Sequence, residues 1–129
     1  MKTIMLLAMF FFVAVPSPVF AEEDPVSHDH NVADTTLQGT IIELACYLQH
    51  GARGETHKSC ARECAEKGLP LGLLTDDGLL YQIMGEGHES LVKINSRFLD
   101  YIEAHVLVVG KVLIKNELKA IIIEKIKKE

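Results

Sequence analysis

The chain has 129 residues, of which 18 are acidic and 13 are lysine or arginine, so its formal net charge at pH 7 is −5. This acidic balance argues against nucleic acid or an anionic membrane surface as a partner, because both attract a basic protein face. All three cysteines lie in one short segment, from Cys46 to Cys64, together with two of the six histidines.

Residues 1–21 have the pattern of a cleaved signal peptide. Lys2 gives a positive start, the run Ile4–Val15 is apolar, and prolines precede a Val-Phe-Ala sequence of the type that signal peptidase cleaves. This run is too short to span a bilayer, which needs about 20 apolar residues. We therefore expect a periplasmic or secreted bacterial protein with no stable membrane insertion after cleavage; an uncleaved anchor is the alternative.

Residues 22–36 have the composition of a flexible leader. The segment has no aromatic residue and only isolated aliphatic ones, so it cannot bury enough apolar surface to order itself. His28 and His30 flank Asp29, a group that binds divalent metals weakly in some His-rich tracts, but solvated histidines are the simpler interpretation. A single domain is expected over residues 37–129.

The first half of this domain predicts a strand, an inserted helix and a β-hairpin. Residues 37–48 are rich in alternating and β-branched apolar residues, which favours a strand. Good helix formers over 56–67 lie between Thr56, a candidate N-cap, and Gly68, a helix stop. Two apolar runs then flank an Asp-Asp-Gly turn at 76–78, where glycine accepts the positive φ of a tight hairpin turn.

The second half predicts one more helix and a closing pair of strands. The apolar spacing in 85–105 fits a helix in the second half of that segment. Residues 105–128 predict two strands joined near Lys115 and Asn116, with Gly110 marking a bulge or bend in the first of them. Without the inserted helix, this is the element order of an OB-fold, a five-stranded Greek-key barrel. We therefore expect a mainly β fold with helices: an OB-fold-like barrel with a Cys/His-bearing helix inserted after the first strand.

The domain also resembles small exported bacterial OB-fold-like proteins over residues 37–127. The resemblance lies in the phrase "AHVLVVGKVLIKNELKAIIIEKI" and in a Cys-Tyr-Leu segment followed by "GETHKSCARECAEKGLPLGLL", which contains a His-x2-Cys-x3-Cys helix. It implies the fold and no particular activity. OB-folds commonly bind oligonucleotides or oligosaccharides, but the acidic charge and an aromatic content of 6% suit that use poorly.

The Cys/His segment predicts a site for a thiophilic metal ion. In a regular helix His57, Cys60 and Cys64 share one face, at positions i, i+3 and i+7. Cys46, expected at the end of the preceding strand, is brought near them by a glycine-containing loop. Three thiolates and one imidazole suit zinc, copper(I) or an iron–sulfur centre and exclude calcium and magnesium. His50 is an additional candidate ligand.

The acidic residues of this region are interpreted as a charged helix surface without a catalytic role; they are Glu43, Glu55, Glu63 and Glu66. No Ser/His/Asp arrangement, phosphate-binding glycine loop or pair of catalytic acids is recognisable, so we predict no enzymatic turnover.

Two other uses of the cysteines remain open. Cys46 can form a disulfide with Cys60 or Cys64, as secreted proteins often do, but any pairing leaves an odd thiol. Thiol redox chemistry with His57 as base is the second, although the Cys-x-x-Cys spacing typical of redox sites is absent. The predicted function is an exported metal-binding protein that holds zinc or copper(I) for metal handling or structural stabilisation. A disulfide-stapled OB-fold interaction module or a small thiol redox protein is the alternative, and another exported protein is a candidate partner.

Overall fold

The structure is a computed structural model of the chain, and it describes residues 34–129. The predicted signal peptide (1–21) and most of the predicted leader (22–36) lie outside the described residues. The last three leader residues belong to strand β1 (Asp34–Glu43), so the domain includes Asp34 rather than beginning at residue 37. Within 34–129, no helix is both long enough and apolar enough to cross a membrane.

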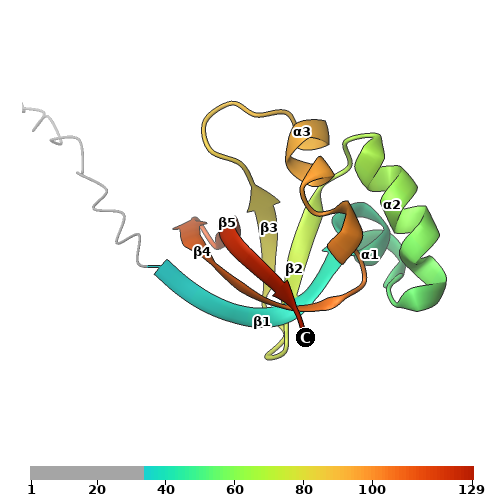
Figure 1. The fold of residues 1–129 in the computed structure, drawn as a ribbon, viewed down its shortest axis with the longest axis horizontal. Helices are drawn as coiled ribbons and strands as arrows, with labels where there is room; N and C mark the ends of the chain where they lie inside the picture. The colour runs from blue at the N-terminus through green and yellow to red at the C-terminus, as the bar shows by residue number, and fades with distance from the viewer. Residues whose placement is uncertain (1–33) are drawn as a thin grey trace, which may run out of the picture.

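The described chain alternates short helices with five strands (Figure 1). After β1 come α1 (Leu44–His50), the 3-10 helix η1 (Glu55–His57), α2 (Lys58–Glu66), β2 (Leu71–Thr75), β3 (Leu80–Met84), α3 (Leu91–Ser96), the 3-10 helix η2 (Leu99–Tyr101), β4 (His105–Lys115) and β5 (Leu118–Lys128).

The five strands form one mixed sheet that closes on itself. Strand β1 pairs antiparallel with both β2 and β4. The pairs β2–β3 and β4–β5 are also antiparallel, whereas β3 and β5 run parallel. The order around the closed sheet is β1-β2-β3-β5-β4. The prediction of a mainly β fold with helices is confirmed.

The turns and the bulge fall where the sequence predicts them. Gly78 has a φ of 86° in the turn between β2 and β3. Asn116 and Glu117, with φ of 47° and 69°, join β4 to β5. The register between these two strands shifts at Val109 and Gly110, which confirms the predicted bulge.

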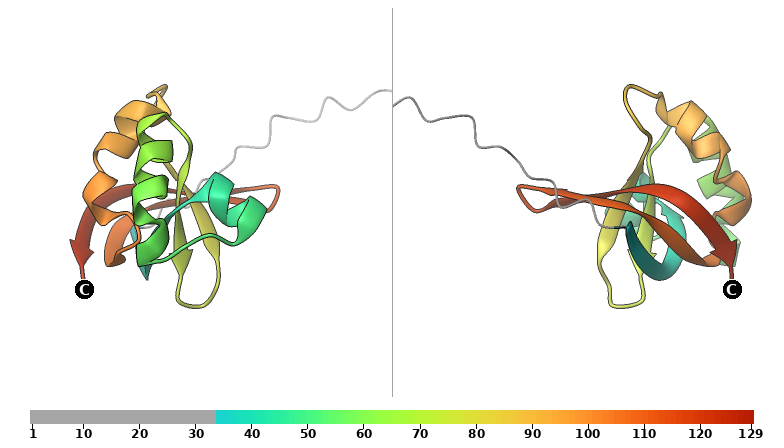
Figure 2. Two further views of the ribbon diagram at one scale, coloured as in Figure 1. Left: turned by 90° about the vertical axis from the view of Figure 1, so that its right-hand side faces the viewer. Right: turned by 60° about the vertical axis from the view of Figure 1, so that its left-hand side comes forward.

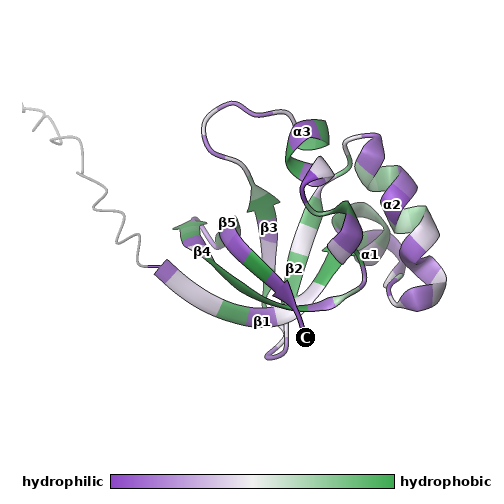
Figure 3. Ribbon diagram, viewed as in Figure 1, coloured by the Kyte–Doolittle hydropathy of each residue, from purple (hydrophilic) through white to green (hydrophobic). Residues whose placement is uncertain are grey.

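Apolar side chains from the strands fill the interior of the sheet, and the helices gather at one side of it (Figure 1). Figure 2 shows α2 and α3 side by side, and Figure 3 shows hydrophilic and hydrophobic residues alternating along α2. Ala61 and Ala65 are the two fully buried residues by which α2 joins the core. The largest fully buried apolar side chains are Ile41, Ile42, Leu71, Leu73, Ile83, Ile102, Val106, Val108 and Ile121.

Asn95 fastens α3 to the end of α2, the helix that carries two of the cysteines. It is 1% exposed, and its Nδ2 donates to the carbonyl oxygens of Ala65 and Leu69, each at 2.8 Å. We expect Asn95→Ala to lower the free energy of unfolding by about 1–3 kcal/mol, because two inward-facing carbonyls lose their donor. Urea unfolding of the reduced, metal-free protein measures this.

The matched control is Ser96→Ala, which changes the exposed neighbour. Its effect on the unfolding free energy should stay within about 0.5 kcal/mol. Equal losses in the two variants would show that Asn95 does not fasten the helices together.

Candidate metal centre

Cys46 lies in helix α1, not at the end of a strand as predicted. The helix begins there because the Glu43 carboxylate caps it, accepting hydrogen bonds from the backbone N–H groups of Ala45 (2.7 Å) and Cys46 (2.8 Å). Gly51 ends the helix in the left-handed conformation, with a φ of 65°. The strand predicted over 37–48 therefore stops at Glu43, and the cysteine is placed by a helical turn.

His57 lies at the junction of η1 and α2, not inside one regular helix. The predicted N-cap, Thr56, does not cap either element: Gly54 is the N-cap residue of η1 and His57 itself that of α2. Glu103 holds the loop that precedes η1: its Oε2 accepts a 2.7 Å hydrogen bond from the Gly54 N–H. The backbone N–H of His57 in turn donates to the Gly54 carbonyl at 2.9 Å.

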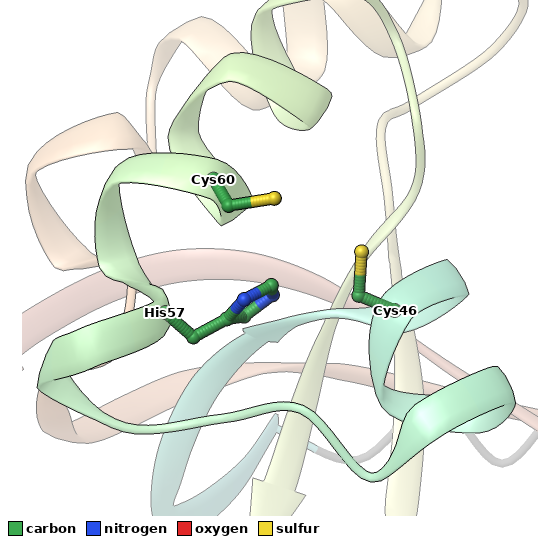
Figure 4. A group of neighbouring side chains, drawn as sticks. All are labelled: Cys46, His57 and Cys60. Carbon is green, nitrogen blue, oxygen red and sulfur yellow. The ribbon is translucent and has the colours of Figure 1, made fainter.

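Cys46, His57 and Cys60 form a Cys/His group close enough to hold a metal ion. One donor atom from each residue lies within 4.8 Å of the other two. Figure 4 shows the three side chains directed from α1, η1 and α2 toward a common space. A tetrahedral zinc ion with bonds of about 2.0–2.3 Å needs donors roughly 3.5 Å apart, so small side-chain rotations suffice to close the group on an ion.

Cys64 belongs to a second group, which it forms with Glu43 and Cys46 under the same 4.8 Å limit. The four predicted ligands therefore divide between two groups that share Cys46. His50 is exposed and belongs to neither of the groups found among residues 34–129. All three cysteines are free thiols.

One nitrogen of the His57 ring is available to bind a metal ion. Its Nε2 is buried and has no hydrogen-bond partner, one of three such side-chain atoms among the described residues. Buried polar atoms are nearly always paired, so an unpaired nitrogen on a ring that is grouped with two thiols calls for a ligand. A metal ion is such a ligand, because neutral imidazole binds zinc and copper through this type of atom.

The surroundings of Cys46 and Cys64 keep both thiols protonated. A hydrogen bond to Glu43, with burial and the nearby negative groups, raises the pKa of Cys46 to about 12. Burial, followed by the neighbouring Cys60 and Glu43, raises the pKa of Cys64. Because metals bind the thiolate, an ion must displace a proton from each of these thiols.

Alkylation should reveal this protonation. At pH 8 a thiol with a pKa of about 12 has roughly a thousandth of the thiolate of an ordinary cysteine. We therefore expect Cys46 in the reduced, metal-free protein to react with iodoacetamide far more slowly than Cys60, which is exposed. Peptide mapping by mass spectrometry after a short pulse gives the two rates, and the denatured protein is the control. Equal native rates would contradict the assigned environment of Cys46.

Sequence reasoning missed two glutamates at this site. Glu43 was assigned to a charged helix surface, but it is 0% exposed and caps α1. The available signal was its position as the single charge in the apolar run "TIIELACYL". Glu103 was not singled out; burial raises its pKa, opposed by the hydrogen bond from Gly54, and its Oε1 is buried without a hydrogen-bond partner.

An open pocket of about 570 Å³ is formed by β5, the segment after α3 and the segment before it. Its rim charges are paired, since Arg97 contacts Glu89 at 3.1 Å and Lys111 contacts Glu124 at 2.9 Å. No cysteine or histidine lines it, and none of its lining residues belongs to either donor group found among residues 34–129. The lining residues are Glu86, Glu89, Arg97, Phe98, Ile122, Ile123, Glu124 and Ile126.

Comparison of the chain with protein-family models, with curated proteins and with solved structures found no match. The resemblance to small exported OB-fold-like proteins therefore stays a prediction, and the functional assignment depends on the geometry of the site.

Proposed function

We propose that this chain is an exported, non-enzymatic metal-binding protein that holds a thiophilic ion, zinc or copper(I), through Cys46, His57 and Cys60. The observation that carries the proposal is the convergence of two thiols and an imidazole whose buried Nε2 lacks any other partner. Soft sulfur donors with one imidazole select these ions over hard cations.

The site suits an ion that exchanges with other ligands rather than one that is bound permanently. Three protein ligands leave the fourth position of a tetrahedral ion open, whereas structural zinc sites have four protein ligands. Cys60 is exposed, so an incoming ligand or chelator can reach an ion bound there. Metal buffering or delivery is therefore favoured over a purely stabilising role.

The raised pKa values argue against Cys46 or Cys64 as the nucleophile of a redox site. A catalytic thiol attacks as the thiolate and has a lowered pKa, whereas the pKa values of Cys46 and Cys64 are raised. A metal ion overcomes this disadvantage because its bonds to sulfur replace the proton.

The fold and the location are proposed on different grounds. The closed order of five strands and the α3 helix between β3 and β4 support an OB-fold-like barrel with α1 and α2 inserted after its first strand. Export is proposed from the apolar pattern of residues 1–21, and another exported protein that supplies or accepts the metal is the proposed partner.

The test compares two histidine variants. Protein purified from the periplasm without a metal-chelating tag is expected to contain zinc or copper by elemental analysis. His57→Ala should lower the affinity for the most tightly bound ion at least about tenfold. This is the lower end of the range for loss of a group that supports a metal ligand. His50→Ala removes an exposed imidazole outside both groups and should leave the affinity unchanged.

Two results would reject the proposal. One is protein that lacks metal and does not take up zinc or copper(I) after reduction. The other is a native protein lighter by about two mass units than its reduced form, together with no ion, which indicates a disulfide in place of the site.

A further inference from the structure

The second donor group differs from the first in the chemical types of its ligands. Glu43, Cys46 and Cys64 combine a carboxylate with two thiols, all within 4.8 Å of one another. They come from the end of β1, from α1 and from the second turn of α2. Cys46 is the member that this group shares with the Cys46–His57–Cys60 group.

Glu43 is a buried acid with no basic partner. Its exposed fraction is 0%, and none of the ion pairs formed within residues 34–129 includes it. The two backbone N–H groups that it caps hold the carboxylate in place but bring no full positive charge. A buried charge is costly unless it is paired or binds a metal, and the adjacent sulfurs add negative charge once they lose their protons.

We propose that Glu43, Cys46 and Cys64 form a second ion position, and that the Cys46 thiolate bridges two divalent ions. The proposal rests on the proposed function, because the first ion is held by the same cysteine. Three thiolates and one carboxylate carry four negative charges, which two divalent ions neutralise completely. Zinc accepts sulfur, nitrogen and oxygen ligands together, whereas copper(I) selects soft sulfur donors. The carboxylate therefore identifies the cargo as a pair of zinc ions.

The proton balance distinguishes the two positions. The first zinc ion takes the place of two thiol protons, those of Cys46 and Cys60. The second ion displaces only the Cys64 proton, because the Cys46 sulfur has already exchanged its proton for the first ion. Filling both positions releases three protons, two with the first ion and one with the second, with no change of oxidation state.

Zinc titration of the reduced, chelator-treated protein tests the proposal. Native mass spectrometry is expected to show two zinc ions per chain, and calorimetry in buffers of different ionisation enthalpy should give two protons and then one. Cys64→Ser should retain one zinc ion, because Cys46, His57 and Cys60 are unchanged. Glu63→Gln alters the exposed carboxylate beside Cys64, outside both groups, and should retain two.

Each other outcome has a definite meaning. A single zinc ion that survives Cys64→Ser overturns the second position and leaves the proposed function standing. A single ion that Cys64→Ser abolishes also overturns it, in favour of one four-ligand site made by Cys46, His57, Cys60 and Cys64. Two ions that persist in Cys64→Ser place the second ion elsewhere and overturn the proposal. Absence of any zinc and of copper(I) rejects the proposed function as well.

Discussion

Cys46→Ser is expected to abolish tight binding of zinc and copper(I), with a loss of affinity of at least about a hundredfold at every ion position. Cys46 is the residue common to both donor groups, so its loss leaves each group with only two ligands. A serine hydroxyl is a hard, weakly acidic ligand that does not replace a thiolate for these ions. The expected effect lies above the 10–100-fold range for residues that only support a metal ligand.

The three cysteine-to-serine variants form a matched series. Cys60→Ser and Cys64→Ser each remove a ligand from one group, so each should retain one zinc ion, whereas Cys46→Ser should retain none. Competition with a zinc chelator, together with native mass spectrometry, measures both affinity and stoichiometry. A Cys46→Ser variant that holds zinc as tightly as the unmodified chain would refute a site centred on this cysteine.

The elements set by local chemistry were predictable. The turn at Gly78 follows from the need for positive φ, and the bulge at Gly110 follows from a close approach that leaves no room for a side chain. A Cβ added to Gly110 would lie 2.2 Å from the carbonyl oxygen of Ile122 on the neighbouring strand. The two closing strands were recognisable because their apolar, β-branched residues continue without a helix start signal.

The boundary between β1 and α1 was not predictable from local preference. The apolar run that contains Glu43 and Cys46 suits a strand throughout, and glutamate is not among the favoured N-cap residues. The strand ends at the last residue of its pairing with β2, where Glu43 lies opposite Leu71, and the carboxylate of the same residue caps the helix that follows. A further tertiary contact, from the N–H of Leu44 to the carbonyl of Pro70 at 2.9 Å, fixes the turn.

The composition of the site was predictable only in part, because its last members depend on tertiary contacts. The sequence pattern identified Cys46, His57 and Cys60 by residue type and spacing, and they do converge. Helical periodicity alone placed Cys64 in the same group, but it assumed that His57 continues the α2 helix. His57 instead belongs to η1, and Cys64 is grouped with Glu43 and Cys46 rather than with the imidazole. A buried carboxylate that caps a helix is a tertiary feature that residue spacing does not encode.

The affinity for zinc is expected to rise steeply with pH, by at least about a hundredfold between pH 7 and pH 9. The metal-free protein favours the Cys46 thiol, whose pKa is raised to about 12, chiefly by the hydrogen bond to Glu43. Zinc binds only the thiolate, so proton and metal compete for the same sulfur across this whole range. Each pH unit below the pKa therefore changes the affinity tenfold for this one proton, and the affinity increases as the proton is removed. The raised pKa of Cys64 adds to the slope at the second position.

The slope also tests the cause of the raised pKa. Glu43→Gln removes the carboxylate that is the largest contributor, so the pKa of Cys46 should return toward the ordinary thiol value of about 8.5. The pH dependence of zinc affinity, measured against a chelator of known proton affinity, should then flatten above about pH 8.5 in the variant while it continues to rise in the unmodified chain. Circular dichroism establishes that the variant is folded. An equally steep rise in both proteins up to pH 9.5 would mean that Glu43 does not control the proton on Cys46, and the electrostatic link between the buried carboxylate and the bridging sulfur would have to be abandoned.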